Sequence, residues 1–136
     1  MKDRRNRSGT RNCLPGRLLL DTNIIDRLDE DSEVLNELLN SRSLLCFITE
    51  VQLAELTAIP DEIRRNRLIE LVRTLCRQLH TDQPAMGKHS MDSAIAAAAI
   101  AHNCCLVSCD IGLLEHATAA GAACLSWDQF ISKLFL

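Results

Sequence analysis

The sequence predicts a single α/β domain whose short, mainly parallel sheet is flanked by helices on both faces. Short apolar runs, typical of strands, alternate along the chain with longer segments whose apolar residues recur at helical spacing. The runs are almost wholly apolar, as expected of parallel strands that are buried on both faces. A length of 136 residues suits one domain that buries its own core.

The first half of the domain is expected to contain two strands and four helical stretches. Uninterrupted apolar runs predict the strands, and apolar side chains three or four positions apart predict the longer helices. In chain order these elements are a strand at 18–20, a brief helical stretch to residue 28, a helix at 33–40, a strand at 44–48, and helices at 50–59 and 61–79. Thr49 is the expected N-cap of the helix at 50–59, and Pro60 ends that helix.

The second half begins with a loop at 81–89, which contains Pro84 and Gly87. Ser90 is expected to cap the helix that follows. The remaining elements are a helix at 91–103, a strand at 105–108, a helix at 111–119, a strand at 124–126 and a terminal helix at 128–135.

Charge separates a basic N-terminal arm from the domain. Residues 1–17 hold six basic side chains and one acidic one, although the whole chain has a formal net charge of −3. We therefore expect residues 1–16 to be a basic, flexible arm and residues 17–136 to be the folded domain. Such an arm either contacts nucleic acid phosphates or is a disordered leader, and the sequence favours neither interpretation.

Composition excludes several classes of protein. No apolar stretch approaches the length of a membrane span, and no apolar core follows the basic N-terminus, so neither a membrane protein nor a secreted one is expected. The seven cysteines lack the paired spacing of zinc sites and are expected to be reduced thiols in the cytoplasm. An aromatic content of 3%, with no Tyr, argues against a module that binds single strands by stacking bases.

Four acids lie just after predicted strands or near the beginnings of helices. They are Asp21, Glu55, Asp92 and Asp110. The carboxyl ends of parallel strands meet at one edge of a sheet, where such folds bind ligands. Several carboxylates gathered there repel one another unless a hard cation such as Mg²⁺ or Mn²⁺ neutralises them. Singly, each acid has a simpler explanation as a turn former, a helix cap or a solvated side chain.

Two other α/β enzyme or signalling classes also place an Asp after the first strand. Phosphatases of the haloacid dehalogenase type need a second Asp two residues later, where this chain has Asn23. Response-regulator receivers need a Lys after the last strand, whereas the late Lys133 lies in the predicted terminal helix. Both classes therefore fit poorly.

Five segments, in order and spacing, resemble the PIN-domain family, especially its VapC-like toxin branch. They read LLLDTNI from Leu18, ITEVQLAEL from Ile48, MDSAIAA from Met91, CLVSCD from Cys105 and LSWDQF from Leu125. The resemblance extends from Arg17 to Phe130. Many VapC-like members have a further strand and helix before the helix that carries the third acid, whereas here only residues 80–90 separate the two expected helices.

The resemblance implies a metal-dependent endoribonuclease, the toxin of a type II toxin-antitoxin pair. Asp21 and Asp92 would be the main ligands of Mg²⁺ or Mn²⁺, with Glu55 as a ligand or base and Asp110 completing the site. Thr22, Asn23 and Ser108 would orient these acids by hydrogen bonding. The implied partners are an RNA substrate and an antitoxin protein. A homodimer is expected as well, because the amphipathic helices predicted at 33–40 and 61–79 have more apolar surface than one small sheet covers. The alternative is a non-catalytic PIN-like domain that binds protein or RNA.

Overall fold

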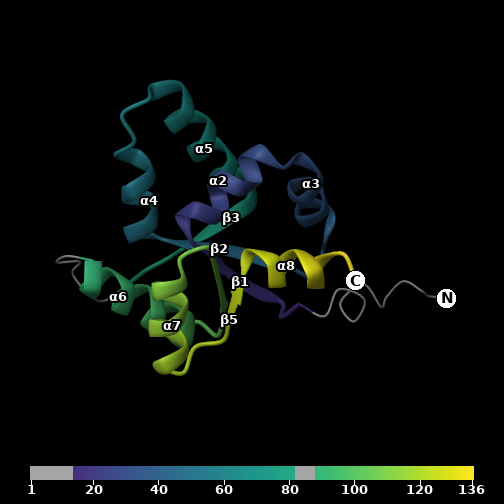
Figure 1. Cartoon of the computed structure of the whole chain (residues 1–136). Helices are drawn as coiled ribbons and strands as arrows, with labels where there is room; N and C mark the ends of the chain where they lie inside the picture. Colours follow the sequence, from purple (N-terminus) through teal and green to yellow (C-terminus); the bar gives the residue numbers. More distant parts are fainter. Residues whose placement is uncertain (1–13, 82–87) are drawn as a thin grey trace.

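A computed structural model describes residues 14–81 and 88–136 of the chain (Figure 1). The elements alternate between strands and helices throughout. In chain order they are β1 (Arg17–Leu20), α2 (Thr22–Glu30), α3 (Ser32–Asn40), β2 (Leu45–Thr49), α4 (Glu50–Thr57), α5 (Glu62–Leu75), β3 (Cys76–Leu79), α6 (Lys88–Ala101), β4 (Cys105–Ser108), α7 (Ile111–Ala119), β5 (Cys124–Ser126) and α8 (Trp127–Leu134).

The sheet has five strands in the order β3-β2-β1-β4-β5, and every pairing is parallel. The predicted α/β class is therefore confirmed. β1 lies at the centre of the sheet, paired with β2 on one side and with β4 on the other. Successive connections run outward from β1 in one direction and then, after β3, in the other, which creates a switch point between β1 and β4.

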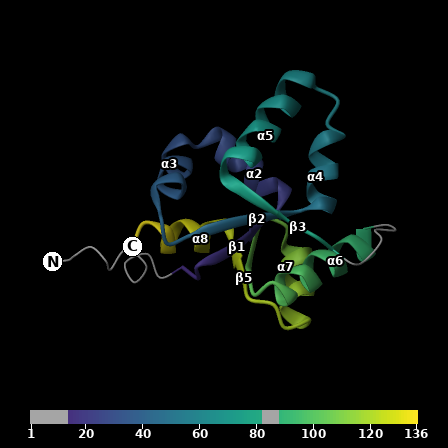
Figure 2. The same ribbon diagram turned by 180° about the vertical axis from the view of Figure 1, so that it is seen from behind.

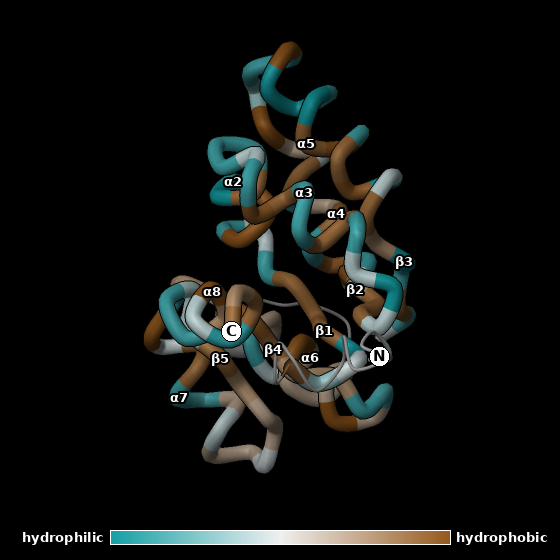
Figure 3. Tube along the Cα trace, turned by 90° about the vertical axis from the view of Figure 1, so that its right-hand side faces the viewer, coloured by the Kyte–Doolittle hydropathy of each residue, from teal (hydrophilic) through white to brown (hydrophobic). Residues whose placement is uncertain are grey.

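The two faces of the sheet carry separate hydrophobic cores, because successive strand residues point to opposite faces. In β1, Leu18 and Leu20 pack in the larger core together with residues of α2, α3, α4, α5 and α8. Leu19 instead packs in a smaller core with residues of α6 and α7. Figures 1 and 2 show these two helical layers on opposite sides of the strands, and Figure 3 shows the hydrophobic residues along β1 between them.

The single helix predicted at residues 61–79 is wrong. α5 ends at Leu75, and the next four residues form the edge strand β3, in which Cys76 pairs with Cys46 and Leu79 with Thr49. Arg77 consequently lies on an exposed strand and is not one helical turn from Arg73. A strand, β3, therefore lies between α5 and the helix that carries Asp92, where the sequence predicted none.

The helix that carries Asp92 also begins earlier than predicted. α6 starts at Lys88, so Ser90 lies within the helix instead of capping it. Asp92 is consequently in the second turn. Most of the loop predicted at 81–89 lies outside the described residues. The other predicted helices and strands are present, with boundaries that differ by a few residues.

The residues immediately before β1 contact the domain. Leu14 is only 8% exposed and packs in the larger core, and the carbonyl of Gly16 accepts a 2.8 Å hydrogen bond from Leu45 N. A truncation experiment should therefore distinguish residues 1–13 from residues 14–16.

We expect deletion of residues 1–13, which have no apolar pattern, to leave the melting temperature unchanged. Deletion of residues 1–16 should lower the free energy of unfolding by about 2 kcal/mol or more, because it removes a buried leucine. Calorimetry of both truncations, with Leu14→Ala as a control for the side chain alone, measures the difference. Equal melting temperatures for the two truncations would show that Leu14 contributes little.

The cysteines of the described region are unpaired. Six of the seven lie there, and all six are free thiols. Burial raises the pKa of Cys46 to about 12 and that of Cys105 to about 11, so both remain protonated at neutral pH. None of the helices within the described residues is long and apolar enough to span a bilayer.

Candidate functional site

The candidate site lies at the carboxyl edge of the sheet, beside the switch point between β1 and β4. Asp21 directly follows β1, and its backbone N–H donates a 3.0 Å hydrogen bond to the carbonyl of Val107 in the neighbouring strand. Asp21 also caps α2, since its side chain accepts from Thr22 N. One residue thus ends the central strand, begins the next helix and presents a carboxylate at the switch point.

The Asp21 carboxylate is buried and fully hydrogen-bonded. It is 6% exposed. Oδ1 accepts from Thr22 N at 2.9 Å and from Gln52 Nε2 at 3.2 Å. Oδ2 accepts from Asn23 Nδ2 at 3.1 Å and from Ser108 Oγ at 2.7 Å. Because an ionised carboxylate has only acceptor sites, this set of four donors fixes its position and orientation.

Asn23 and Ser108 connect Asp21 with the loop after β4. The Asn23 side chain donates to Asp21 and accepts from Cys109 N at 3.0 Å. Ser108 Oγ donates to Asp21 and accepts from Asp110 N at 2.9 Å. The two β–α loops are therefore held together by side chains that contact both, and these hydrogen bonds fix the orientation of the Asp21 carboxylate.

Glu55 and Asp110 are each linked to Asp21 through one bridging residue, Thr22 for Glu55 and Ser108 for Asp110. Thr22 Oγ1 donates to Glu55 Oε1 at 3.4 Å, and the Thr22 backbone N–H donates to Asp21. Asp110 is the N-cap of α7 and accepts from Leu113 N at 3.1 Å. The structure thus brings Asp21, Glu55 and Asp110 to the same edge of the sheet, with Asp110 also serving as a helix cap.

Asp92 lies on α6, which packs on the opposite face of the sheet from α2 and α4. It is half-buried, and the contacts of the described residues do not link its carboxylate to the other three acids. Next to it, Ser93 Oγ lies 3.1 Å from His116 Nε2 and joins α6 to α7.

The four acids have the oxygen donors that a divalent cation prefers, but they are not spaced closely enough to surround one. Carboxylate oxygens are the ligands that Mg²⁺ and Mn²⁺ prefer. Within residues 14–81 and 88–136, however, no three His, Cys, Asp or Glu side chains surround a common point closely enough to hold a metal ion. All four acceptor positions of Asp21 are moreover occupied by protein donors, so a cation would have to displace at least one of them.

Gln52, which was not among the predicted site residues, is fully buried beside Asp21. Its side chain accepts from Thr49 N at 2.9 Å and donates to Asp21, while Thr49 Oγ1 accepts from Gln52 N. The Thr49–Gln52 spacing is that of a capping box, a signal already present in the sequence. The box orients the amide toward the carboxylate and connects α4 to the site.

A cavity of about 220 Å³ opens beside these side chains, and the elements that line it are α2, α4 and α5 with the turn after α4. Thr22, Asn23 and Glu55, which belong to the site, line it together with Asp26 and Arg64. The Arg64 guanidinium holds both carboxylate oxygens of Asp26 through Nη2 alone, at 2.6 Å each.

Comparison with known proteins identifies the fold. The chain matches no family model and no curated protein. Among solved structures it is similar to the PIN domain endonuclease Utp24, with 20% identity over 81% of this chain and 84% of that chain, and a TM-score of 0.61.

Two archaeal structures are similar to the same degree. A PilT N-terminus domain protein from Sulfolobus solfataricus has 13% identity over 87% of this chain and 93% of that chain, with a TM-score of 0.61. A domain of a functionally unknown protein from Methanocaldococcus jannaschii has 18% identity over 82% of this chain and 91% of that chain, with a TM-score of 0.60. The chain therefore has the fold found in PIN-domain proteins.

Proposed function

We propose that the protein is a metal-dependent endoribonuclease and the toxin of a toxin-antitoxin pair, with RNA as substrate and an antitoxin protein as inhibitor. The observation that supports this proposal best is the buried Asp21 carboxylate, held by four donors at the switch point of the sheet. Such an acid costs free energy to bury and to orient, which is characteristic of a functional site.

The residues around Asp21 have distinct tasks in this proposal. Asp21, Asp92 and Asp110 are the proposed metal ligands, and Glu55, exposed at the rim, either joins them or orients the attacking water. A bound Mg²⁺ or Mn²⁺ would polarise the scissile phosphate and lower the pKa of its water. Asn23, Ser108 and Gln52 hold the Asp21 carboxylate in place while substrate binds and leaves.

The test combines cleavage with metal binding. The purified protein should cut single-stranded RNA in Mn²⁺ or Mg²⁺ and stop cutting in EDTA. Millimolar Mn²⁺ should also raise the melting temperature, since a ligand that binds only the folded state stabilises it, and Asp21→Asn should remove most of that rise.

The alternative function is that of a non-catalytic module that binds protein or RNA. An unchanged melting curve in Mn²⁺, together with intact RNA after incubation, would favour this alternative. RNA bound with micromolar or better affinity but never cut would favour it most directly.

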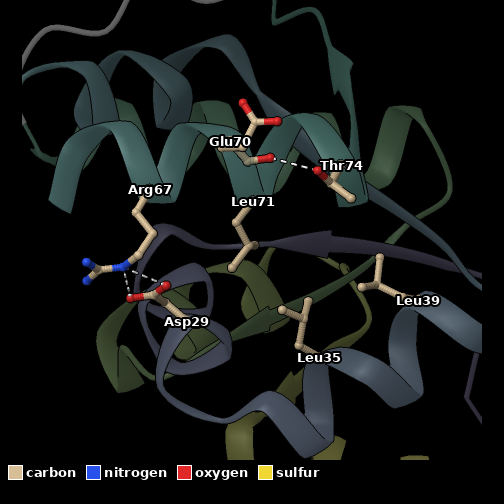
Figure 4. Close-up of a pocket in the computed structure, with 7 residues that line it drawn as sticks. All are labelled: Asp29, Leu35, Leu39, Arg67, Glu70, Leu71 and Thr74. Atoms are coloured by element: carbon tan, nitrogen blue, oxygen red, sulfur yellow. Dashed lines mark hydrogen bonds and ion pairs between the residues drawn. The ribbon is translucent and has the colours of Figure 1, made fainter. Parts of the chain in front are cut away.

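We also propose that a second copy of the chain packs against the apolar groove between α3 and α5, forming a homodimer. Figure 4 shows Leu35 and Leu39 of α3 opposite Leu71 of α5, around a cavity of about 310 Å³. At one end, Arg67 Nε donates to both oxygens of Asp29 at 2.9 and 3.0 Å. A two-fold interface must be complementary to itself, and this groove offers apolar surface bordered by the basic Arg67 and the acidic Asp29 and Glu70.

We expect the wild-type chain to be a dimer in light scattering and Leu39→Asp to be a monomer. Leu39 is 45% exposed, so the substitution should leave the fold intact while burying a carboxylate in the proposed interface. Ile63→Asp is the matched control, because Ile63 is 76% exposed and does not line the groove. A monomeric wild type, or a dimeric Leu39→Asp, would contradict the interface.

A further inference from the structure

We infer that Arg64 binds a phosphate of the RNA strand next to the one that is cleaved, and that Asp26 positions the guanidinium for this contact. The inference rests on the proposed function and adds a substrate-binding residue to it. It starts from the cavity that the acidic site shares with α2, α4 and α5.

The size and position of this cavity fit one segment of a bound polymer better than a whole small molecule. Its volume of about 220 Å³ is below the range of roughly 300–1,000 Å³ that is usual for a pocket enclosing a whole small molecule. Thr22, Asn23 and Glu55 line it and also belong to the site. A strand bound across Asp21 therefore has room there for an adjacent nucleotide.

The acidic lining of the cavity means that an RNA strand needs a positively charged side chain to bind there. Glu55 and Asp26 line it and, together with Asp21 beside it, repel a phosphodiester backbone. Arg64 is the one basic residue among its lining residues, all of which belong to the described part of the chain. A guanidinium at this wall lowers the electrostatic cost of bringing an anionic strand to an acidic site.

The ion pair leaves Arg64 able to bind a second anion. Nη2 donates to both oxygens of Asp26, whereas Nε and Nη1 donate no hydrogen bond within the described residues. Nε and Nη1 lie on either side of Nη2, and each has an N–H that can donate to a phosphate oxygen. The Arg64 side chain remains 39% exposed, so a strand can reach it.

Asp26 contributes by fixing the guanidinium. A long arginine side chain loses rotamer freedom when it binds, and an arginine already held by a carboxylate loses less. The hydrogen bonds and charge of Asp26 also raise the pKa of Arg64 above its ordinary value, which keeps the guanidinium protonated.

The same two helices contain a matched control pair. Three residues further along each helix, Arg67 of α5 holds Asp29 of α2 in a similar ion pair, but these residues line the groove between α3 and α5 (Figure 4). Arg64→Gln and Arg67→Gln each remove one positive charge and one exposed ion pair. They differ in which cavity loses its cation.

The experiment measures RNA affinity by fluorescence anisotropy in EDTA, as a function of salt, for a labelled single-stranded RNA. Arg64→Gln should weaken binding several-fold and reduce the slope of log Kd against log salt by about 0.7, the value for one lost phosphate contact on a single strand. Arg64→Lys should restore the slope, and Arg67→Gln should change neither quantity. With Mn²⁺ present, Arg64→Gln should raise KM more than it lowers kcat.

The outcomes separate this inference from the proposed function. If the wild type cleaves RNA but Arg64→Gln and Arg67→Gln have the same affinity and slope, the inference is wrong and the nuclease proposal remains. If the slope falls by about 0.7 only in Arg64→Gln but no variant cleaves RNA, Arg64 binds phosphate in a non-catalytic module. If the wild type does not bind RNA even at low salt, the inference is overturned.

Discussion

Asp21→Asn should reduce the rate of RNA cleavage by more than roughly 100-fold, the most that loss of a residue hydrogen-bonded to a metal ligand usually costs. The substitution removes the charge at the centre of the site. It also places an amide N–H₂ where an oxygen now accepts two hydrogen bonds, from Thr22 N and Gln52 Nε2 on one side or from Asn23 Nδ2 and Ser108 Oγ on the other. Cleavage is measured in single-turnover reactions with excess enzyme.

Ser108→Ala provides a graded comparison. It keeps the Asp21 charge but removes the 2.7 Å hydrogen bond to Oδ2 and the acceptor for Asp110 N. Its expected cost is about 10- to 100-fold, because the acid remains but is less well oriented. Glu115→Gln, at an exposed position of α7, should cleave at the wild-type rate. If Asp21→Asn stayed as active as Glu115→Gln, Asp21 would be a structural helix cap only.

Stability has to be measured beside activity, because Asp21 also supports the fold. Each donor left without an acceptor in a buried site costs about 1–3 kcal/mol. Ser108 can reduce this cost by rotating its hydroxyl and accepting from the new amide. We therefore expect Asp21→Asn to remain folded with a lower melting temperature in the absence of metal.

The strands β1, β2 and β4 could be predicted from the sequence because the pattern that identifies them is local. β1, β2 and β4 are short runs of buried apolar residues, and burial on both faces selects such runs. β3 has no such signal, since Arg77 and Gln78 are exposed on the sheet edge. Leu71, Leu75 and Leu79 are four residues apart and continue the helical pattern, so only the pairing with β2 reveals the strand.

The site was predictable to the extent that its residues follow strands. Asp21 and Ser108 lie at the ends of the adjacent strands β1 and β4, so the parallel sheet alone places them together. Gln52 reaches the site through its capping box, which requires the tertiary position of α4. The orientation of Asp92 depends on how α6 packs on the sheet, and no spacing in the sequence specifies it.

The second large effect that we expect is growth inhibition. Expression of the wild-type chain without an antitoxin should slow or stop growth of a bacterial host, because an unrestrained endoribonuclease depletes RNA. An antitoxin that extends a basic side chain among Asp21, Glu55 and Asp110 would be an electrostatically favourable inhibitor. Co-expression of such a partner should restore growth.

Asp92→Asn tests this prediction most cleanly. Within the described residues the Asp92 side chain makes no hydrogen bond or ion pair, so the nearly isosteric amide removes a charge without breaking a structural contact. We expect Asp92→Asn to restore growth at the same expression level, whereas Glu115→Gln remains inhibitory. If Asp92→Asn inhibited growth as strongly as the wild type, Asp92 would not belong to the site, and catalysis would depend on Asp21, Glu55 and Asp110. A wild-type chain that cuts RNA in vitro but leaves growth unchanged would contradict the toxin role alone.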